Sequence, residues 1–289
     1  MTEITKQFVK DNMPHRPMDA NKGTMGTLLN ISGSYSMAGA CILSSLSALK
    51  SGVGLLKVAL PKSIYPIVSS QVYEAVFVPY GDSEKICVSH SELDFLLDTA
   101  SVSQATLIGC GLSLCDDTVG FVRDFTKAYT GKLLLDADGI NAVALNIDVL
   151  KDTKAKVVIT PHAKEMSRLI RKDVSYVLSN RENVAVDFAK DYGVVVVLKG
   201  KDTIVTDGES VYVNKTGNAG MAKGGSGDVL SGIISSFMAQ GKDPFVSACM
   251  GVYVHGLCGD MAAECLSQTA MLPRDIVSCL PQVFLNIEN

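Results

Sequence analysis

The chain has 289 residues, of which 47% are hydrophobic and 19% charged, so it holds ample material for a core and too little charge for a disordered protein. Its 26 basic and 30 acidic side chains give a net charge of −4, with no basic run that would follow a phosphate backbone. Nucleic acid is therefore excluded as a partner.

The N-terminal segment, residues 1–12, is charged and lacks the apolar region of a secretory leader. We find no apolar stretch near the roughly 20 residues that a membrane span needs. The sequence therefore predicts a cytoplasmic protein without a membrane anchor.

Short β-branched runs then alternate with helical patterns, as in a parallel sheet built from βαβ units. We predict strands at Thr27–Ser32, Leu55–Leu60, Ala75–Val78, Thr106–Gly109, Lys132–Asp136, Val157–Thr160 and Val194–Leu198. Nearly all of their residues are apolar, as in strands covered on both faces. Since the sequence has no internal repeat or linker, we predict a single domain over residues 1–289.

Helices fit between these strands. Met37–Ser51 is rich in small residues and ends before Gly52, a helix stop. Pro61 suits the first position of the next helix.

Beyond the last of these strands, two further short strands are expected. Thr203–Thr206 and Val211–Asn214 bracket Asp207-Gly208, a hairpin dipeptide, which predicts a small antiparallel addition to the sheet.

From Ser226 onward the pattern is mostly helical. We predict helices at Asp228–Gln240, Pro244–Cys265 and Met271–Leu280. We expect them to form a cap at the C-terminal end of a doubly wound, mostly parallel α/β domain with flanking helices.

Eight cysteines are scattered without any Cys-x-x-Cys pair, at positions 41, 87, 110, 115, 249, 258, 265 and 279. Most lie in apolar patterns. We predict buried, reduced thiols rather than a metal site or disulfides.

The most informative segment is the glycine-rich stretch from Asn214 to Asp228, with five glycines between residues 217 and 227. Such a loop lets several backbone N–H groups converge, and the helix that begins near Ser226 adds its positive dipole end. We predict a phosphate-binding anion hole formed by Gly224, Gly225, Ser226 and Gly227.

Asp228 lies in the first turn of that helix, where its carboxylate would face whatever reacts at the phosphate. The alternative is a helix-capping acid, but a cap needs no glycine cluster before it. The glycine spacing matches neither a P-loop nor a dinucleotide-binding fingerprint. A carboxylate at a helix N-terminus is expected to stay ionised and to be a weak base.

Gly-Gly-Ser-Gly-Asp before an apolar helix resembles the anion hole and catalytic aspartate of ribokinase-like enzymes. The longer string from Gly217 to Gly232 is similar to one branch of them, the ADP/ATP-dependent NAD(P)H-hydrate dehydratases. Four more segments match in order: His15–Gly26 leading to Ile31–Ser34, Ala38–Ala40 with Ala48–Leu55, Leu135–Asn141, and Thr160–Glu165. Two departures are mild, since Gly109-Cys110-Gly111 replaces Gly-Pro-Gly and Ser226 stands where threonine is common.

The resemblance implies a ribokinase-like fold and a metabolite-repair lyase. Its substrate would be the S form of hydrated NADH or NADPH, with water added at C6 of the nicotinamide ring. ADP, favoured over ATP, would phosphorylate the hydroxyl, and phosphate would then leave. Relatives that carry a fused epimerase domain are longer, and we expect none here.

The resemblance also assigns residues. Asp228 would be the base that accepts the hydroxyl proton, and substrate would contact Ala40, Gly111, His162 and Asp228. Nucleotide would bind at Lys199, Gly200, Lys201, Asp202, Thr203 and Gly227.

Taken without the resemblance, these segments are less informative. Lys199–Thr203 would equally be a polar turn, and a lone histidine such as His162 is usually structural, although it follows a strand end where α/β sheets bind ligands. Asp136 and Asp138 are candidates for the metal and phosphate side. His15, His90 and His255 show no ligand spacing. Mg²⁺ is expected with the nucleotide, its ligands being unassigned.

Two other functions fit parts of the pattern. A ribokinase-like kinase acting on a vitamin-precursor alcohol would share the glycine loop and Asp228, but it would release a phosphate ester. A non-catalytic nucleotide-binding protein would not need a carboxylate that repels the phosphate. The sequence leaves the donor nucleotide, the NADH or NADPH preference and the oligomeric state open, although the resemblance suggests a homo-oligomer such as a tetramer.

Overall fold

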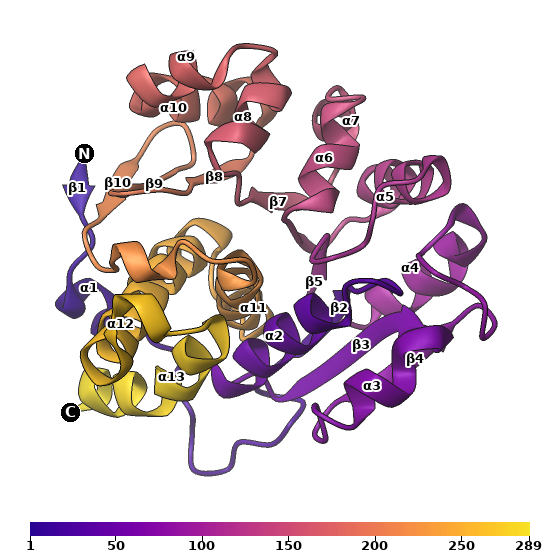
Figure 1. Cartoon of the computed structure of the whole chain (residues 1–289), viewed down its shortest axis with the longest axis horizontal. Coiled ribbons are helices and arrows are strands. Elements are labelled where there is room, and N and C mark those ends of the chain that lie inside the picture. Colours follow the sequence, from indigo (N-terminus) through magenta and orange to yellow (C-terminus); the bar gives the residue numbers. More distant parts are fainter.

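The computed structural model describes residues 1–289, and its ten strands form one sheet in the order β1-β10-β9-β8-β7-β6-β5-β2-β3-β4 (Figure 1). The strands are β1 (Thr2–Glu3), β2 (Thr27–Ile31), β3 (Leu55–Pro61), β4 (Val76–Tyr80), β5 (Ala105–Ile108), β6 (Lys132–Leu135), β7 (Lys156–Ile159), β8 (Val195–Leu198), β9 (Thr203–Thr206) and β10 (Val211–Asn214). Only β9 runs antiparallel to its neighbours. The predicted parallel strands and the hairpin addition are therefore confirmed.

Helices cover both faces of this sheet. One face carries α1 (Lys6–Asn12), α2 (Ala38–Lys50), α3 (Tyr65–Ser69), α11 (Ser226–Ala239), α12 (Pro244–Ala270) and α13 (Pro273–Glu288). The other carries α4 (Leu93–Ser101), α5 (Asp116–Ala128), α6 (Asp138–Ala144), α7 (Val149–Asp152), α8 (Ala163–Ile170), α9 (Val174–Ser179) and α10 (Arg181–Tyr192). Short 3-10 turns lie at Lys62–Ile64, His90–Glu92 and Ala219–Met221.

The two faces have separate apolar cores because successive strand residues point to opposite sides. Leu28 and Leu107 pack under α2 and α11, whereas their chain neighbours Leu29 and Ile108 pack under α4 and α5. Strands buried on both sides must be apolar throughout, which explains the continuous runs in the sequence.

Two helix predictions are wrong in detail. Pro61 is the last residue of β3, where its missing N–H falls at the end of the ladder, and Pro66 instead occupies the first turn of α3. The C-terminal helices do not cap one end of the domain, because α11 packs against α2 and the central strands and forms a layer on one face (Figure 1).

The prediction of no span-length apolar segment is also wrong, because α12 is long and apolar enough to cross a membrane by length and composition alone. Its 18-residue apolar window has a mean hydropathy of 1.2, and 67% of that window is buried inside the protein. The helix is apolar because it lies in the core, beside α11, α13 and the strands from β7 to β10. Its regular part ends at Ser267, whose φ is +71°.

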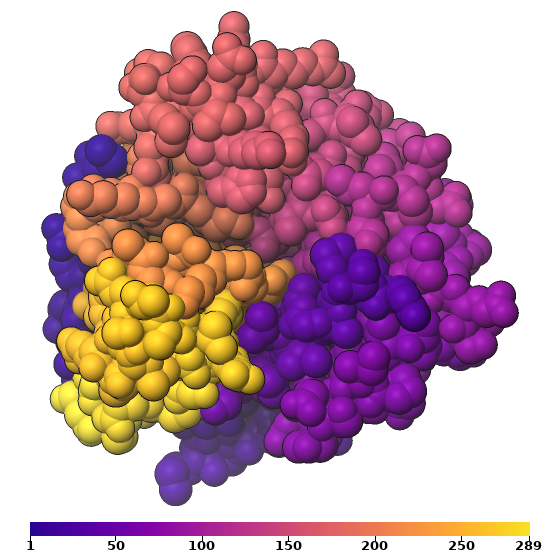
Figure 2. Space-filling model, viewed as in Figure 1, coloured from indigo at the N-terminus to yellow at the C-terminus, as the bar shows by residue number.

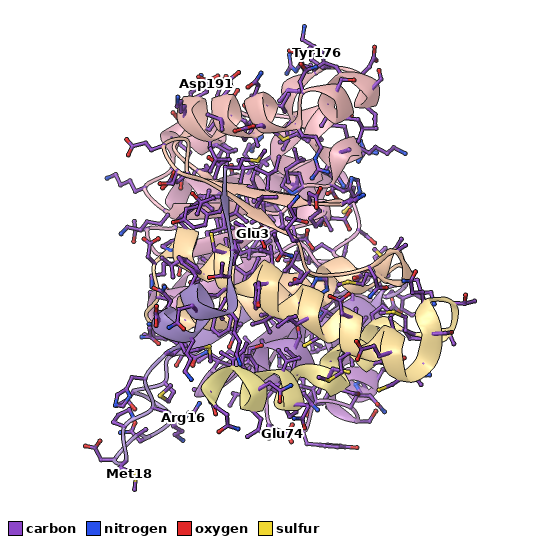
Figure 3. The ribbon with its side chains drawn as sticks, turned by 90° about the vertical axis from the view of Figure 1, so that its left-hand side faces the viewer. Glu3, Arg16, Met18, Glu74, Tyr176 and Asp191 are labelled. Carbon is purple, nitrogen blue, oxygen red and sulfur yellow. The ribbon has the colours of Figure 1, made fainter.

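The N-terminal segment was not predicted to join the sheet, but β1 pairs with β10 as a short edge strand. Figure 3 shows Glu3 beside the hairpin strands, and it shows Arg16 and Met18 in a segment that projects from the body of the protein. Arg16 anchors this segment by donating to the Gly52 carbonyl oxygen at 2.7 Å.

The chain reverses its direction of travel across the sheet between β2 and β5. It moves outward from β2 through β3 to β4, and then returns to β5 on the opposite side of β2. Ligands of open α/β sheets bind beyond the carboxyl ends of the strands near such a switch point.

Candidate active site

A cleft of about 990 Å³ opens at the carboxyl ends of β6, β7 and β8. Asp136 follows β6, His162 follows β7 and Lys199 follows β8, while the glycine loop and the start of α11 form the opposite wall. In Figure 2 the orange residues of this loop lie at the surface beside the yellow C-terminal helices. The chain thus brings segments that lie far apart in the sequence, from Asp136 to Gln268, into one cavity.

Most of the residues singled out in the sequence line this cleft. They are His162, Lys199–Thr203, Gly224–Gly227 and Asp228. Ala40 and Gly111 do not line it but meet each other at the switch point, where a Cβ on Gly111 would lie 2.8 Å from that of Ala40. Asp228 lines the cleft and also lies near the pair Ala40 and Gly111, because Cys110, the neighbour of Gly111, is close to the Asp228 carboxylate.

The glycine loop presents unpaired backbone donors at the start of α11. Gly225 is the N-cap of α11 with φ of +99°, and a Cβ there would lie 2.7 Å from Leu43. Glycine is therefore required. The amides of Gly224, Gly225, Gly227 and Asp228 donate to no acceptor in the chain, whereas Ser226 N–H already donates to the Lys223 carbonyl at 3.2 Å. Unpaired amides at a helix N-terminus suit a phosphate group.

Side chains of α12 hold this loop in place. Asp260 accepts from Gly217 N–H at 2.8 Å and from the Asn218 amide at 3.0 Å. The Thr216 hydroxyl donates to the Tyr253 carbonyl at 3.0 Å, and Gly256 admits this approach because a Cβ there would lie 2.0 Å from the threonine oxygen. The loop conformation is thus fixed largely by contacts of residues 216–218 with α12.

Asp136 and Lys199 form an ion pair at the floor of the cleft. Lys199 Nζ lies 2.8 Å from Asp136 Oδ1, and the two side chains are 19% and 2% exposed. Burial alone would raise the pKa of Asp136, but Lys199 and a hydrogen bond from Thr160 lower it. Burial likewise opposes the charge of Lys199, but Asp136 raises its pKa. Both groups are therefore ionised at neutral pH.

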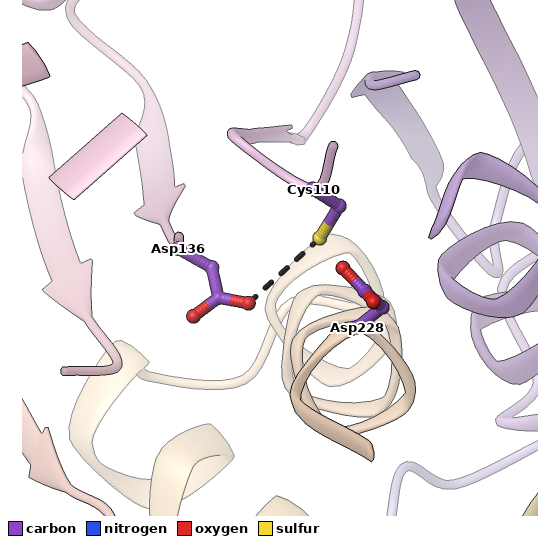
Figure 4. A group of neighbouring side chains, drawn as sticks. All are labelled: Cys110, Asp136 and Asp228. Carbon is purple, nitrogen blue, oxygen red and sulfur yellow. Dashed lines mark hydrogen bonds between the residues drawn. The ribbon is translucent and has the colours of Figure 1, made fainter. Parts of the chain in front are cut away.

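Asp228 lies beside this pair and has no cation of its own (Figure 4). Its carboxylate accepts no hydrogen bond from a backbone N–H group, so it does not cap α11. Burial and the negative charge of Asp136 raise the pKa of Asp228 to about 6. The expectation of an ordinary, weakly basic carboxylate is wrong, because desolvation outweighs the helix dipole.

The Cys110 thiol lies between the two carboxylates. Its sulfur is 3.9 Å from Asp136 Oδ2, and its Sγ and one oxygen each of Asp136 and Asp228 lie within 4.8 Å of one another (Figure 4). Burial raises the pKa of this thiol well above its ordinary range, so it stays protonated. Hydrogen bonding to the thiol lowers the pKa of Asp228 and partly opposes the burial.

His162 is a helix cap at the edge of the cleft. The Nδ1 atom of the His162 ring accepts from the backbone N–H of Glu165 at 3.0 Å, and the backbone N–H of His162 donates to Glu165 Oε2 at 2.8 Å. Nε2 therefore carries the proton of the neutral ring, and the side chain is 51% exposed. Burial raises the pKa of Glu165 to about 7. The histidine has a structural role here, and its half-exposed Nε2–H, 3.5 Å from Glu165 Oε1, lies at the edge of the cleft.

The predicted nucleotide-binding stretch, residues 199–203, is held by Arg181 of α10. This side chain donates to the carbonyl groups of Leu198 at 3.0 Å, Lys201 at 2.6 Å and Asp202 at 3.2 Å. Gly200 has φ of +146° and lies against the guanidinium group. Arg181 could not be recognised from the sequence, because it acts through contacts to main-chain oxygens.

His255 of α12 was also missed. It lines the cleft, and its Nε2 lies 3.4 Å from the Ser226 hydroxyl of the glycine loop. Burial lowers the pKa of His255 to about 4, so the imidazole is neutral. No spacing pattern could have revealed it, because it reaches the loop from a helix 29 residues further along the chain.

Asp138 points away from the cleft. Its carboxylate accepts from Ser113 N–H at 2.9 Å, in the loop that follows β5. It is therefore not placed to contact the nucleotide side, whereas Asp136 is.

The cluster of Cys110, Asp136 and Asp228 has the spacing of a metal site, but its chemistry does not suit a protein-built cage. The thiol is protonated and Asp136 is paired with Lys199. Mg²⁺ prefers oxygen ligands and uses one or two carboxylates together with substrate phosphates. These residues fit a Mg²⁺ ion that arrives on nucleotide phosphates, with Asp228 as the carboxylate free to approach it.

Residues 28–282 match the family model of the NAD(P)H-hydrate dehydratases. The chain belongs to this family. A protein of Cenarchaeum symbiosum named ADP-dependent (S)-NAD(P)H-hydrate dehydratase is 32% identical over 97% of this chain and 96% of its own length. The ADP/ATP-dependent NAD(P)H-hydrate dehydratase of Bacillus subtilis, co-crystallised with ATP and Mg²⁺, is 27% identical with a TM-score of 0.85 over 99% of both chains. The fold is ribokinase-like, as expected.

A Moorella thermoacetica protein named bifunctional NAD(P)H-hydrate repair enzyme is 35% identical over 99% of this chain but only 54% of its own length. The chain spans about half the length of such bifunctional relatives. It corresponds to the part of those proteins that also occurs alone in the C. symbiosum protein.

Proposed function

We propose that this protein is a hydro-lyase that returns the S form of hydrated NADH and NADPH to the reduced dinucleotides, with ADP or ATP as phosphoryl donor. The proposal is supported by family membership and by a cleft in which unpaired amides, a buried lysine and a carboxylate of raised pKa meet. ADP is favoured as the donor, since the C. symbiosum relative is named as ADP-dependent.

Asp228 acts as the base. As the C6 hydroxyl oxygen attacks the terminal phosphorus, the carboxylate accepts the hydroxyl proton, and the bond from phosphorus to the leaving nucleotide breaks. A pKa of about 6 leaves Asp228 mostly ionised at neutral pH and makes it a better acceptor than an ordinary aspartate. The amides of Gly224, Gly225, Gly227 and Asp228 stabilise charge on the phosphoryl oxygens.

Loss of phosphate completes the reaction. The C6–O bond breaks with the help of the ring nitrogen lone pair, inorganic phosphate leaves, and loss of a proton from C5 restores the double bond. Phosphorylation serves to turn hydroxide, a poor leaving group, into phosphate. Mg²⁺, bound with the nucleotide near Asp228, supplies charge neutralisation to the phosphates.

Lys199 and the main chain of residues 200–203 hold the nucleotide, and Arg181 keeps that stretch in position. The hydrated ring lies between the switch-point pair, Ala40 and Gly111, and Asp228, with His162 at the rim.

The test is to incubate the purified protein with hydrated NADH, Mg²⁺ and either ADP or ATP, and to follow recovery of reduced-nicotinamide absorbance together with release of inorganic phosphate. We expect recovery only when a nucleotide is present. Equal recovery without nucleotide would refute phosphoryl transfer. A stable phosphate ester formed from an alcohol instead of NADH and phosphate would identify a vitamin-precursor kinase.

We also propose a single catalytic domain, a cytoplasmic location and self-association as a tetramer. The eight cysteines are unpaired, as in a reducing compartment. Helix α9 exposes Val174, Tyr176 and Leu178, apolar side chains of a kind found at subunit contacts. Light scattering of the purified protein measures the oligomeric state.

A further inference from the structure

Two cysteines from separate segments, neither of which lines the nucleotide cleft, lie close together. Cys87 Sγ, in the loop that follows β4, lies 3.3 Å from Cys115 Sγ, which directly precedes α5. A disulfide bond is about 2.05 Å long, so roughly 1 Å of movement would join the two sulfur atoms. The prediction that the cysteines are buried thiols is wrong for Cys115 and Cys265, which are exposed.

Cys115 has the surroundings of a reactive thiol. It is the N-cap residue of α5, and the first-turn amides of a helix favour a negative charge. Partial burial raises the pKa of Cys115, but hydrogen bonds from Thr118 and Cys87 outweigh it and the pKa is lowered, against an opposing charge from Asp117. The Thr118 hydroxyl donates to the Val88 carbonyl at 2.8 Å. The Thr118 oxygen, 3.2 Å from Cys115 Sγ, is therefore left to accept from the Cys115 thiol, and the Cys87 S–H, 3.3 Å away, is the side-chain donor available to a Cys115 thiolate.

Cys87 is the complementary partner. It is buried, and desolvation together with the neighbouring Cys115 raises its pKa, although Lys85 opposes this. The bond from Thr118 to Val88 fixes the Cys87 segment against α5. An exposed thiolate beside a protonated, protected thiol is the arrangement of a sensing cysteine and its resolving partner.

We propose that Cys87 and Cys115 form a reversible oxidation site that a hydroperoxide converts to a disulfide. The Cys115 thiolate attacks the O–O bond and takes one oxygen as sulfenic acid, while the other leaves as water or an alcohol after protonation. The Cys87 sulfur then attacks the sulfenic sulfur, and its proton leaves with the hydroxyl as a second water. The two thiols lose two electrons, and the peroxide gains them.

The disulfide would join two loops that both contact the segment before α2. Tyr35 N–H donates to the Ile86 carbonyl at 2.8 Å, beside Cys87. The Ser34 and Ser113 hydroxyl groups lie 3.0 Å apart, on the Cys115 side. The disulfide would therefore join the two loops that contact residues 33–37, the segment that leads into α2, the helix that carries Ala40.

The experiment treats the full-length protein with hydrogen peroxide in slight excess over protein, alkylates the remaining thiols and maps peptides by mass spectrometry. We expect two of the eight thiols to be lost together, a Cys87–Cys115 linked peptide lighter by two hydrogens, and recovery with dithiothreitol. Cys87→Ser should instead give a Cys115 sulfenic acid that dimedone traps, because no resolving thiol remains.

Cys265→Ser is the matched control, because Cys265 is exposed as well but its sulfur has no hydrogen-bond partner in the protein. This variant should form the linked peptide like the parent. Oxidation of Cys265 or Cys279 before Cys115, or over-oxidation of Cys115 in the parent without any linked peptide, would overturn the proposal. Circular dichroism of each variant confirms that the compared proteins are folded.

Discussion

Replacing Asp228 with asparagine separates the catalytic role of this side chain from its effect on stability. The amide has nearly the same size, but it carries no charge and accepts no proton. The pKa of Asp228 is raised from 3.8 to about 6, which corresponds to about 3 kcal/mol at 1.36 kcal/mol per unit. This is an upper limit on the free energy by which the ionised carboxylate destabilises the folded protein.

The size of this effect depends on pH. Near pH 8 the folded protein holds Asp228 ionised beside Asp136, whereas the unfolded chain ionises it freely, so Asp228→Asn should raise the free energy of unfolding by up to about 3 kcal/mol. Near pH 3.5 the carboxyl group is largely protonated in both states, and most of the gain should vanish. Urea unfolding at the two pH values measures the difference.

Turnover of the same variant should fall by about 100-fold or more, the lower range for loss of a positioned general base. Nucleotide affinity should be unchanged or slightly higher, because a negative charge near the phosphates has been removed. A variant that is more stable, binds ADP and is inactive would show all three expected effects and would support Asp228 as the base. Near-normal turnover in the folded variant would refute Asp228 as the base and leave this loop as a binding site.

Three further changes test the remaining parts of the site. Lys199→Met should lower the free energy of unfolding by about 3–5 kcal/mol, because it leaves the buried Asp136 carboxylate unpaired. Lys201→Met on the same loop should change the free energy of unfolding little. Equal losses for the two variants in urea unfolding would contradict the ion-pair argument. His162→Asn keeps a side chain that can cap α8, so the fold should survive, and the Michaelis constant for hydrated NADH should rise more than that for the nucleotide. An unchanged Michaelis constant for hydrated NADH would show that the ring contributes only the cap. Cys110→Ala removes a hydrogen bond that lowers the pKa of Asp228. The acid limb of the pH profile of kcat/KM, expected at about pH 6 in the parent, should therefore move to higher pH. A shift to lower pH would exclude this effect of Cys110 on Asp228.

The sequence predicted the sheet well because burial on both faces leaves a simple signature. Each parallel strand appeared as an apolar run, and the ends of the seven runs agree with the strands within one or two residues. Helix placement was harder, since Pro61 is compatible with both a strand end and a first helical turn. The layer formed by α11, α12 and α13 could not be distinguished from a cap, because small apolar residues permit close packing in either arrangement.

The candidate site was predicted only where its chemistry is local in sequence. The glycine loop and Asp228 are adjacent along the chain, so their pattern was visible. The pairing of Asp136 with Lys199 joins residues 63 positions apart, and Arg181 acts through main-chain carbonyls that any sequence would provide. The raised pKa of Asp228 could not be predicted either, since it depends on burial beside Asp136 and not on its place in the helix.

The charges at the cleft floor explain why two carboxyl groups have raised pKa values. Asp136, Glu165 and Asp228 surround a single buried cation, Lys199, which lies 2.8 Å from Asp136 but 4.0 Å from Glu165. Asp136 forms an ion pair with Lys199 and remains ionised. The other two carboxyl groups therefore lie near a neutralised pair, and burial still disfavours their charged forms. Their pKa values of about 7 and about 6 follow. A phosphate that enters the cleft adds negative charge, so the unpaired amides of the glycine loop and a cation carried by the nucleotide are needed together to keep Asp228 ionised as the phosphoryl group arrives.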